Sequence, residues 1–436
     1  MVDPKIKTKI IEAVEDLEQS LIQLLVDTVK IPSMNPSLPG ADIEEYRGAE
    51  TKVATYLKSV MDDMGLETDL FAKEKGRHNI VGTSKGTGNG KSLIFNGHID
   101  VAALGPIADW TIAQPWSGEI IDGKIYGRGT ADMKSGIVAS IIALKAIFKA
   151  GYKPKGDLIF QGVVGEEDME TEIGTGACLE RGYKADAAIV VESTSYPHRL
   201  AICPVQANVN AMTITVKGKS VHCMLRGDTV RPGGAGSQTG VSSIDKAMII
   251  YQGLKRLDEE WALTKKHDLW RKPGWFFIYP TVITGASESP ALIPGETTMA
   301  YILKTPPEDT HEQIKNEVEQ FVQHLAQTDE WLRENPPVIS WPLIWPGYSI
   351  PVEAPICQAA CRAHEAALNS TPEFHGFWMA SDATFLNKAG IPTVLLGPGA
   401  GNTCHAANEY VEIKEMVDAA KIYALMIADW CGIAST

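Results

Sequence analysis

Residues 92–101 read SLIFNGHIDV, and residues 122–136 read DGKIYGRGTADMKSG. The first stretch is an apolar run that ends in His98, with Asp100 two residues later, a pattern typical of a buried strand leading into a polar loop. The second places Asp132 in a glycine-framed turn just before an apolar run of helical length. Strand, polar loop, turn and helix in this order predict an α/β domain with its chemistry at the strand ends.

Strand-like and helical runs alternate through the first half of the chain. We expect helices over residues 6–31, 44–64, 135–150 and 174–181, and strands over residues 79–82, 92–96, 157–164 and 187–192. This alternation predicts a mostly parallel central sheet flanked by helices.

The pattern changes near residue 206. From there the sequence predicts strands over 208–216, 276–283, 296–304 and 338–341, helices over 241–257 and 310–326, and a long loop over 226–240. A helix over 354–368, a strand over 390–396 and a helix over 414–431 resume the first pattern. A chain of 436 residues exceeds the usual span of one core. We therefore expect a discontinuous catalytic domain (1–205 and 346–436) and an inserted α+β sandwich (206–345).

Composition and charge limit the possible partners. Apolar residues make up 44% of the chain, and its formal charge is −14. The acidic balance and the lack of a basic run argue against a nucleic-acid partner. No apolar run approaches the roughly 18 residues of a membrane span, and the start lacks a signal peptide's apolar core. Seven cysteines without a C-x-x-C pair predict reduced thiols, so we expect a cytoplasmic protein. We expect its partner to be a small-molecule substrate.

Two histidines and three carboxylates are the candidate metal ligands: His98, Asp132, Glu167, Glu192 and His405. A carboxylate that bridges two zinc ions about 3.5–4 Å apart gives a hydrolytic centre with a Lewis acid and an activated water. We expect Asp132 to bridge, His98 and Glu192 to complete one metal site, and Glu167 and His405 to complete the other. Zinc is the expected metal, with cobalt or manganese as alternatives.

Two further carboxylates are expected to assist the metals. Asp100 follows His98 by two residues and would accept the free ring N–H, which fixes the tautomer of a metal-binding imidazole. Glu166 stands next to Glu167 and would act as the general base. It would take a proton from the metal-bridging water and pass it to the leaving amine.

Each of these residues also has a simpler interpretation. Asp132 could be the N-cap of the following helix, and Glu166 and Glu167 could lie on a solvated helix face. Cys404 could offer a thiolate ligand, although the carboxylate and imidazole set is complete without it. Ser193 could be a nucleophile, but no Gly-x-Ser-x-Gly elbow surrounds it. The order of the motifs along the chain favours the dinuclear site.

That order resembles the dinuclear-zinc amidohydrolase family of acetylornithine deacetylase, succinyl-diaminopimelate desuccinylase, aminoacylase and glutamate carboxypeptidase. The matching segments are residues 31–33, 97–101, 110–116, 122–136, 166–167, 192, 218–222, 293–295, 397–399 and 405. The resemblance implies an inserted lid or dimerisation domain, a homodimer and a cis peptide after Asp132. It also implies that His222 polarises the substrate carbonyl, in dimeric relatives from the partner subunit.

The sequence departs from the family where the substrate binds. Relatives that act on N-acyl amino acids carry Ser/Thr-Asp-Ala/Gly-Arg, whereas residues 381–384 here read SDAT, with Thr384 in place of the arginine. Threonine cannot replace a bidentate guanidinium. Either Lys304 or Arg226 binds a substrate carboxylate instead, or the substrate lacks one. We expect Asp382 and Gly399 to line the same substrate site. Aromatic residues nearby line a pocket or belong to the core: Trp275, Phe276, Phe277, Phe377 and Trp378.

We therefore predict a metal-dependent hydrolase that cleaves a small N-acyl amide, of the acetylornithine deacetylase or desuccinylase type. Two alternatives are a deformylase or aminohydrolase acting on a heterocyclic or aromatic compound, and a carboxypeptidase or dipeptidase. A metal-binding scaffold without turnover is disfavoured, because all five ligands and Glu166 are present.

Overall fold

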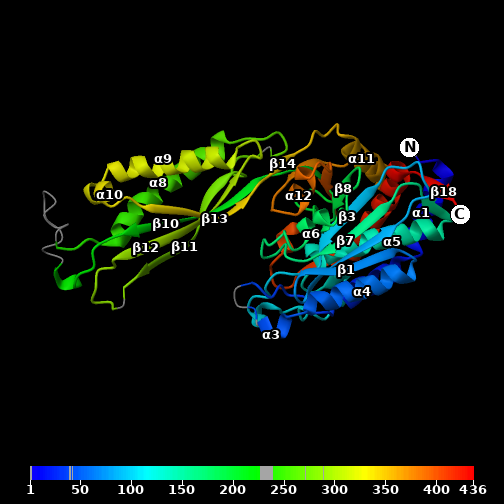
Figure 1. The fold of residues 1–436 in the computed structure, drawn as a ribbon, viewed down its shortest axis with the longest axis horizontal. Helices are drawn as coiled ribbons and strands as arrows, with labels where there is room; N and C mark the ends of the chain where they lie inside the picture. Colours follow the sequence, from blue (N-terminus) through cyan, green and yellow to red (C-terminus); the bar gives the residue numbers. More distant parts are fainter. Residues whose placement is uncertain (1, 39–40, 42, 226–238, 271, 288) are drawn as a thin grey trace. The chain divides into compact units, whose positions relative to one another are not determined.

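The structure is a computed structural model and describes residues 2–38, 41, 43–225, 239–270, 272–287 and 289–436. Arg226 and most of the predicted loop over 226–240 lie outside the described residues. The chain divides into two compact units (Figure 1). The first comprises Met1–Pro204, Ile350–Phe377 and Ser381–Thr436, and the inserted unit comprises Val205–Ser349 and Trp378–Ala380.

The first unit is built on a sheet with the strand order β1-β2-β7-β3-β8-β16-β9-β14, and β15 also pairs with β9. The strands are β1 (Glu67–Glu74), β2 (Arg77–Ser84), β3 (Leu93–His98), β7 (Leu158–Val163), β8 (Ala188–Val190), β9 (Ile202–Gln206), β14 (Tyr348–Ser349), β15 (Phe374–Phe377) and β16 (Thr393–Leu395). The central strands β7, β3, β8 and β16 pair in parallel, and the outer pairings are antiparallel. Because parallel strands end on one edge, residues that follow β3, β7 and β8 meet there.

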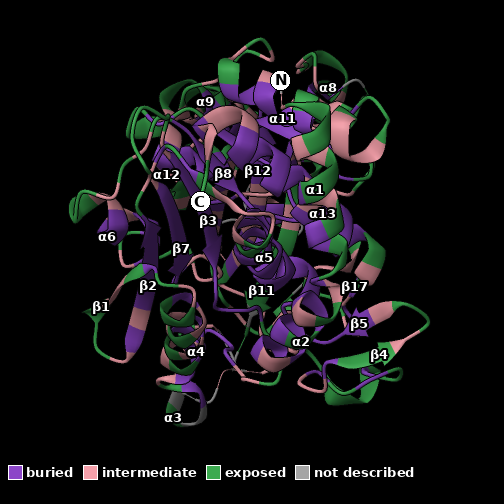
Figure 2. Cartoon of the chain, turned by 90° about the vertical axis from the view of Figure 1, so that its right-hand side faces the viewer, coloured by how far each residue is buried: buried purple, intermediate pink, exposed green. Residues whose placement is uncertain are grey.

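Helices cover both faces of this sheet. They are α1 (Pro4–Glu15), α2 (Glu18–Val29), α3 (Ile43–Tyr46), α4 (Ala49–Asp63), α5 (Ser135–Lys149), α6 (Thr175–Glu180), α11 (Pro355–Leu368), α12 (Ala383–Lys388) and α13 (Ile413–Met426). A Cβ on Gly97 of β3 would lie 2.7 Å from Ile137 of α5, so only glycine lets this helix approach so closely. Asn96 points to the opposite face and donates to Thr175 of α6. Most residues of α5 are buried, and Figure 2 shows the helix beside the central strands.

Several predicted elements are shorter or divided. The single helix expected over 6–31 is two helices, α1 and α2, which the apolar spacing did not separate. The helix expected over 44–64 is interrupted at Gly48, whose φ is +80°. The sequence also gave no sign of β1, an edge strand with no buried residue and hence no apolar alternation.

The inserted unit is a four-stranded antiparallel sheet with the order β11-β12-β10-β13. Its elements are β10 (Asn208–Lys217), α8 (Ser243–Thr264), β11 (Phe277–Ala286), β12 (Glu296–Thr305), α9 (His311–Gln327), α10 (Glu330–Glu334) and β13 (Val338–Trp345). Alternate residues of β10 and β12 are buried, and they form one hydrophobic core with α8 and α9. In this strand order, β11 and β13 are the two edge strands.

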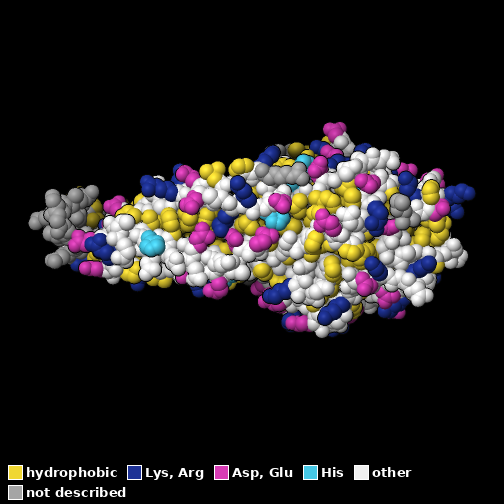
Figure 3. Space-filling view, turned by 90° about the horizontal axis from the view of Figure 1, so that it is seen from above, with side chains coloured by type: hydrophobic (Ala, Val, Ile, Leu, Met, Phe, Trp, Pro, Cys, Tyr) yellow, Lys and Arg dark blue, Asp and Glu magenta, His cyan; other side chains and the backbone are white. Residues whose placement is uncertain are grey.

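Two small sheets complete the first unit. The order β17-β5-β4 joins Tyr410–Glu412, Lys124–Tyr126 and Glu119–Ile121, and β18 (Ile433–Ser435) pairs with β6 (Tyr152–Pro154). The pairing of β5 with β17 brings the turn before Asp132 beside the segment after His405. Among the described residues, no helix combines the length and the apolar character needed to cross a membrane. On the face shown in Figure 3, acidic and basic side chains are interspersed.

Candidate metal centre

His98 is the last residue of β3, and its side chain is buried. Its Nδ1 lies 2.9 Å from the backbone carbonyl of Asp100. Its Nε2 faces three carboxylates, at 3.1 Å from Asp132, 3.6 Å from Glu192 and 3.8 Å from Glu166. The strand end therefore presents one ring nitrogen to an acidic cluster and holds the other against the backbone, as a metal-binding imidazole requires.

Asp132 lies between the two histidines. One carboxylate oxygen is 3.1 Å from Nε2 of His98, and the other is 3.2 Å from Nε2 of His405. The peptide bond from Asp132 to Met133 is cis, as the family resemblance implies. The N-cap of α5 is Lys134, so the simpler interpretation of Asp132 as a helix cap does not hold. A carboxylate with one oxygen toward each imidazole has the arrangement that a bridging ligand needs.

Glu167 and His405 approach the other side of Asp132. Glu167 Oε2 is 3.1 Å from Nε2 of His405. The Glu167 side chain is 3% exposed, whereas that of His405 is 55% exposed and its backbone φ is +60°. A non-glycine residue at positive φ is uncommon and often lies at a functional site. The structure thus brings together all five candidate ligands.

The donor set fits divalent cations. His98, Asp132 and Glu167 can each offer one ligand atom, and these atoms lie within 4.8 Å of one another. Glu167 Oε1 and Glu192 Oε2 are buried and have no hydrogen-bond partner in the part of the chain that the structure describes. A buried carboxylate oxygen without a partner is costly unless a cation or a donor faces it. Four carboxylates surround the two imidazoles, and two divalent cations would balance their four negative charges when all four are ionised.

The pKa values reflect this crowding of negative charge. Burial lowers the pKa of His405, but hydrogen bonds to Asp132 and Glu167 outweigh it and raise the pKa to about 11. Burial and the charge of Asp132 raise the pKa of Glu192 to about 7. Burial and the neighbouring carboxylates Glu192 and Glu167 raise the pKa of Glu166 well above its ordinary value. Glu166 therefore stands in the cluster as a strengthened base.

Asp100 supports the cluster differently from our expectation. Its carboxylate Oδ1 lies 3.8 Å from Nδ1 of His98, beyond hydrogen-bond distance, and its backbone carbonyl takes that position. The other oxygen, Oδ2, accepts hydrogen bonds from Asn35 at 2.8 Å and from the backbone N–H of Glu167 at 3.2 Å. We expected the side chains of His98 and Asp100 to project from the same face of one strand, but β3 ends at His98. Asp100 therefore orients His98 through its main chain and the Glu167 segment through its carboxylate.

Glu409 and Arg128 support the Asp132 turn, and neither role was predicted from the sequence. Glu409 Oε1 accepts from the backbone N–H groups of Ala131 at 2.8 Å and Asp132 at 3.1 Å. Glu409 Oε2 accepts from Nη1 of Arg128 at 2.6 Å. The available signal was the position of Glu409, four residues after His405 in a segment without helical periodicity.

Three of the predicted substrate residues belong to the first unit. Asp382 and Thr384 are buried at the start of α12, and burial raises the pKa of Asp382 to about 7. The charge of Asp382 also contributes to the raised pKa of Glu166. Gly399 has φ +109°, and its N–H donates to Glu415 at 2.9 Å. A Cβ there would lie 2.9 Å from the Cα of Ala131, so glycine permits this approach to the Asp132 turn.

Lys304 and His222 belong to the inserted unit. Lys304 is 4% exposed, and its Nζ donates to the carbonyl of Trp378 at 3.0 Å and lies 4.9 Å from the ring centroid of Trp275. Burial lowers the pKa of Lys304 to about 7. His222 is exposed, and its Nδ1 accepts from the N–H of Met224 at 3.2 Å. Their roles in substrate binding and carbonyl polarisation stay predictions.

The predicted aromatic pocket is partly core. Phe276 is buried and packs with Trp270, Val205 and Ala207 of the inserted unit, with the partly buried Trp275 against them. Phe377 is fully buried in the first unit. These contacts favour the interpretation of Phe276 and Phe377 as core residues.

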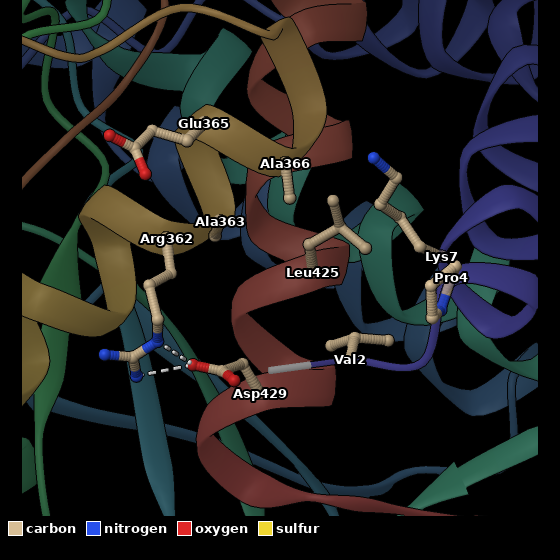
Figure 4. Close-up of a pocket in the computed structure, with 9 residues that line it drawn as sticks. All are labelled: Val2, Pro4, Lys7, Arg362, Ala363, Glu365, Ala366, Leu425 and Asp429. Carbon is tan, nitrogen blue, oxygen red and sulfur yellow. Dashed lines mark hydrogen bonds and ion pairs between the residues drawn. The ribbon is translucent and has the colours of Figure 1, made fainter.

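A separate cavity of about 350 Å³ contains none of the predicted ligands (Figure 4). It is lined by Val2, Pro4, Lys7, Arg362, Ala363, Glu365, Ala366, Leu425 and Asp429. Its polar edge includes the ion pair of Arg362 and Asp429, at 2.6 Å, but no histidine. None of the residues that line this cavity belongs to the acidic cluster at the strand ends.

Known proteins resemble this chain in sequence and in fold. A family model described as Peptidase family M20/M25/M40 matches residues 94–429. The chain is 33% identical to two proteins named N-formyl-4-amino-5-aminomethyl-2-methylpyrimidine deformylase, from Halalkalibacterium halodurans and Bacillus subtilis, each match covering 96% of both chains. The structure of human carnosine dipeptidase 1 superposes with a TM-score of 0.76 at 15% identity, covering 99% of this chain and 100% of that one. The last similarity concerns the fold alone.

Proposed function

The chain belongs to peptidase family M20/M25/M40, and from this we propose that it is a dinuclear metalloenzyme that removes a formyl group from the amine of a small heteroaromatic compound. That it is a metal-dependent amide hydrolase follows from the family and its relatives. The observation that carries the proposal is the position of Asp132, with one oxygen toward His98 and the other toward His405.

We propose that the cluster holds two divalent ions, with zinc as the first candidate and cobalt or manganese as alternatives. His98 and Glu192 would hold one, Glu167 and His405 the other, and Asp132 both. When bound, the ions supply Lewis acidity at the scissile carbonyl and a more acidic water. The buried, unpaired oxygens of Glu167 and Glu192 support this assignment.

Glu166 is the proposed general base. Its carboxylate borders the cluster but lies 3.8 Å from His98, farther than the Asp132 carboxylate. It would accept a proton from the attacking water, whose oxygen bonds to the formyl carbon. As the C–N bond breaks, Glu166 would return that proton to the departing nitrogen, so that formic acid and the neutral amine leave. A base near the operating pH is the most effective, and the raised pKa of Glu166 moves it in that direction.

The proposed substrate class rests on two independent observations. The two deformylase relatives are 33% identical over nearly the whole chain. Thr384 occupies the position of the carboxylate-binding arginine of N-acyl amino acid deacylases, and it is buried in α12. An α-carboxylate would therefore find no guanidinium at this position. A formylated aminopyrimidine needs none.

A substrate panel tests this proposal. Enzyme reconstituted with Zn²⁺ or Co²⁺ would be given N-formyl-4-amino-5-aminomethyl-2-methylpyrimidine, N-acetylornithine and N-succinyl-diaminopimelate, and release of the acid would be measured. We expect kcat/KM for the formyl compound to exceed the others by at least tenfold. A preference for either amino acid derivative would overturn the substrate class but leave the hydrolase intact.

We further propose that the protein is a homodimer formed through the inserted unit and that it works in the cytoplasm. Tyr279, Val282 and Ile283 on the edge strand β11 are exposed, which supports an interface there. The seven free cysteines support a reducing compartment. Sedimentation velocity should give a dimer that Val282→Lys weakens. A monomer at all concentrations would contradict this part of the proposal.

A further inference from the structure

The segment that carries Glu166 and Glu167 has no strand or helix of its own. It runs from the end of β7 at Val163 to the start of α6 at Thr175. Gly165 and Met169 turn the chain with φ values of +84° and +65°. Because no sheet ladder fixes this loop, side chains from other elements must hold its two glutamates in place.

Arg77 reaches the loop from the first position of β2. Its Nη1 lies 3.1 Å from Oδ2 of Asp168 and 3.2 Å from Oε2 of Glu170. Asp168 directly follows Glu167 in the chain. The side chains of Arg77 and Asp168 are 3% and 7% exposed, so their ion pair forms away from solvent, where screening by salt is weak. Glu170 is 47% exposed, so its ion pair with Arg77 lies at the surface.

Glu50 fixes the other side of the guanidinium. Its two oxygens lie 2.9 Å from Nε and from Nη2 of Arg77, in a paired geometry. Glu50 is on α4 and is fully buried. A planar guanidinium held by two bonds to one carboxylate has a defined orientation, which a lysine could not reproduce.

Two more side chains hold the same loop. Asn79 accepts from the N–H of Val164 at 3.1 Å and donates to the carbonyl of Ile173 at 2.7 Å, so it joins the two ends of the loop. Asp100 accepts from the N–H of Glu167 at 3.2 Å. Arg77 completes the set by holding the middle, directly after the two glutamates.

We propose that Arg77 is a positioning residue for Glu166 and Glu167. Held by Glu50, it anchors the loop through Asp168 and Glu170 to the rigid elements α4 and β2. Burying charges offsets much of what their attraction gains, so this network contributes more to a defined geometry than to stability. The inference rests on the proposed roles of Glu166 as base and Glu167 as metal ligand.

The double variant Asp168→Asn/Glu170→Gln tests the inference. It removes the two charges that Arg77 contacts on the loop and leaves the pair of Arg77 and Glu50 intact. We expect Co²⁺ affinity and kcat to fall roughly 10- to 100-fold, the range for partners that orient metal ligands, with a smaller change in KM. The visible absorption spectrum of the Co²⁺ enzyme should shift, because Glu167 would bind in an altered geometry.

A matched control and a rescue sharpen the result. Glu172→Gln changes an exposed carboxylate on the same loop that makes no hydrogen bond or ion pair among the described residues, and it should leave affinity, spectrum and kcat unchanged. In Arg77→Ala, millimolar guanidinium chloride should restore part of kcat, whereas sodium chloride at equal ionic strength should not. If Arg77→Ala does not fold, the double variant decides alone.

The outcomes separate the inference from the proposed function. Wild-type kcat, Co²⁺ affinity and spectrum in the double variant would overturn the role of Arg77, even where Glu166→Gln is inactive. Full turnover in Glu166→Gln would overturn the proposed function itself, whatever the double variant does.

Discussion

Glu409 accepts a hydrogen bond from the backbone N–H of Asp132 at 3.1 Å. The two residues lie 277 positions apart in the chain, and Glu409 follows His405 by four. The buried carboxylate of Glu409 thus fixes Asp132, the proposed bridging ligand. The same segment supplies His405, which faces the Asp132 carboxylate. Arg128 balances the charge of Glu409 at 2.6 Å.

Replacing this carboxylate should loosen the turn. In Glu409→Gln, the side-chain NH2 would face either the backbone N–H groups of Ala131 and Asp132 or the guanidinium of Arg128. In both orientations a donor faces a donor, and one hydrogen bond is lost. A buried donor without an acceptor costs about 1–3 kcal/mol, so the free energy of unfolding should fall by that amount. Metal affinity should fall as well. Urea unfolding and a Zn²⁺ titration measure both, with the exposed Glu412→Gln as the control. Unchanged stability and affinity would show that Glu409 does not support Asp132.

Glu166→Gln should separate proton transfer from metal binding. The amide keeps the size of the side chain but cannot take a proton, so kcat should fall about 100-fold or more, while both metals remain bound. The check is a comparison of kcat with the metal content of the same sample. Loss of metal together with activity would instead make Glu166 a ligand.

The sequence predicted the architecture because the central strands and helices carry strong apolar patterns. The family, the mostly parallel sheet and the amide hydrolase class are confirmed. The site residues could be proposed from their positions after predicted strands, since His98, Glu166 and Glu192 meet at one edge. Their roles stay predictions, although the structure places them within a few ångströms of one another.

The residues that support the site could not be predicted in the same way. Arg77, Glu409 and Asn79 each contact a segment of the site that is 85 or more positions away, and no local pattern marks such pairs. Asp100 was assigned the wrong contact because the strand rule was extended two residues beyond the strand. Long-range pairing and exact strand ends are set by tertiary packing.

His222→Ala should lower kcat without changing metal content, since the residue belongs to the inserted unit and not to the cluster. If His222 acts on the partner's site, mixing His222→Ala with Glu166→Gln should restore activity. With random exchange of subunits, roughly a quarter of the wild-type activity should return, because half of the dimers would hold one complete site. No recovery in verified mixed dimers would mean that His222 acts within its own chain or not at all.

Lys304 should make stability depend on pH. Its pKa is lowered by burial from 10.5 to about 7, so between these values the unfolded chain binds one more proton at this position than the folded chain. The free energy of unfolding should therefore rise with pH across this window, by up to about 1.4 kcal/mol per pH unit. Lys304→Met should flatten the rise and stabilise the protein most at the lower end. Lys255→Met, on the exposed side of α8, is the control. An unaltered slope in Lys304→Met would contradict this account.

The number of metal ions bound per chain tests the central claim most directly. Chelator-treated protein, loaded with Zn²⁺ or Co²⁺, freed of excess metal and analysed by inductively coupled plasma mass spectrometry, should hold about two ions per chain. The Asp132→Ala variant should lose both high-affinity sites, because it lacks the carboxylate that is proposed to bind both ions. A wild-type chain that binds a single ion, or an Asp132→Ala variant that retains two, would contradict the bridged centre.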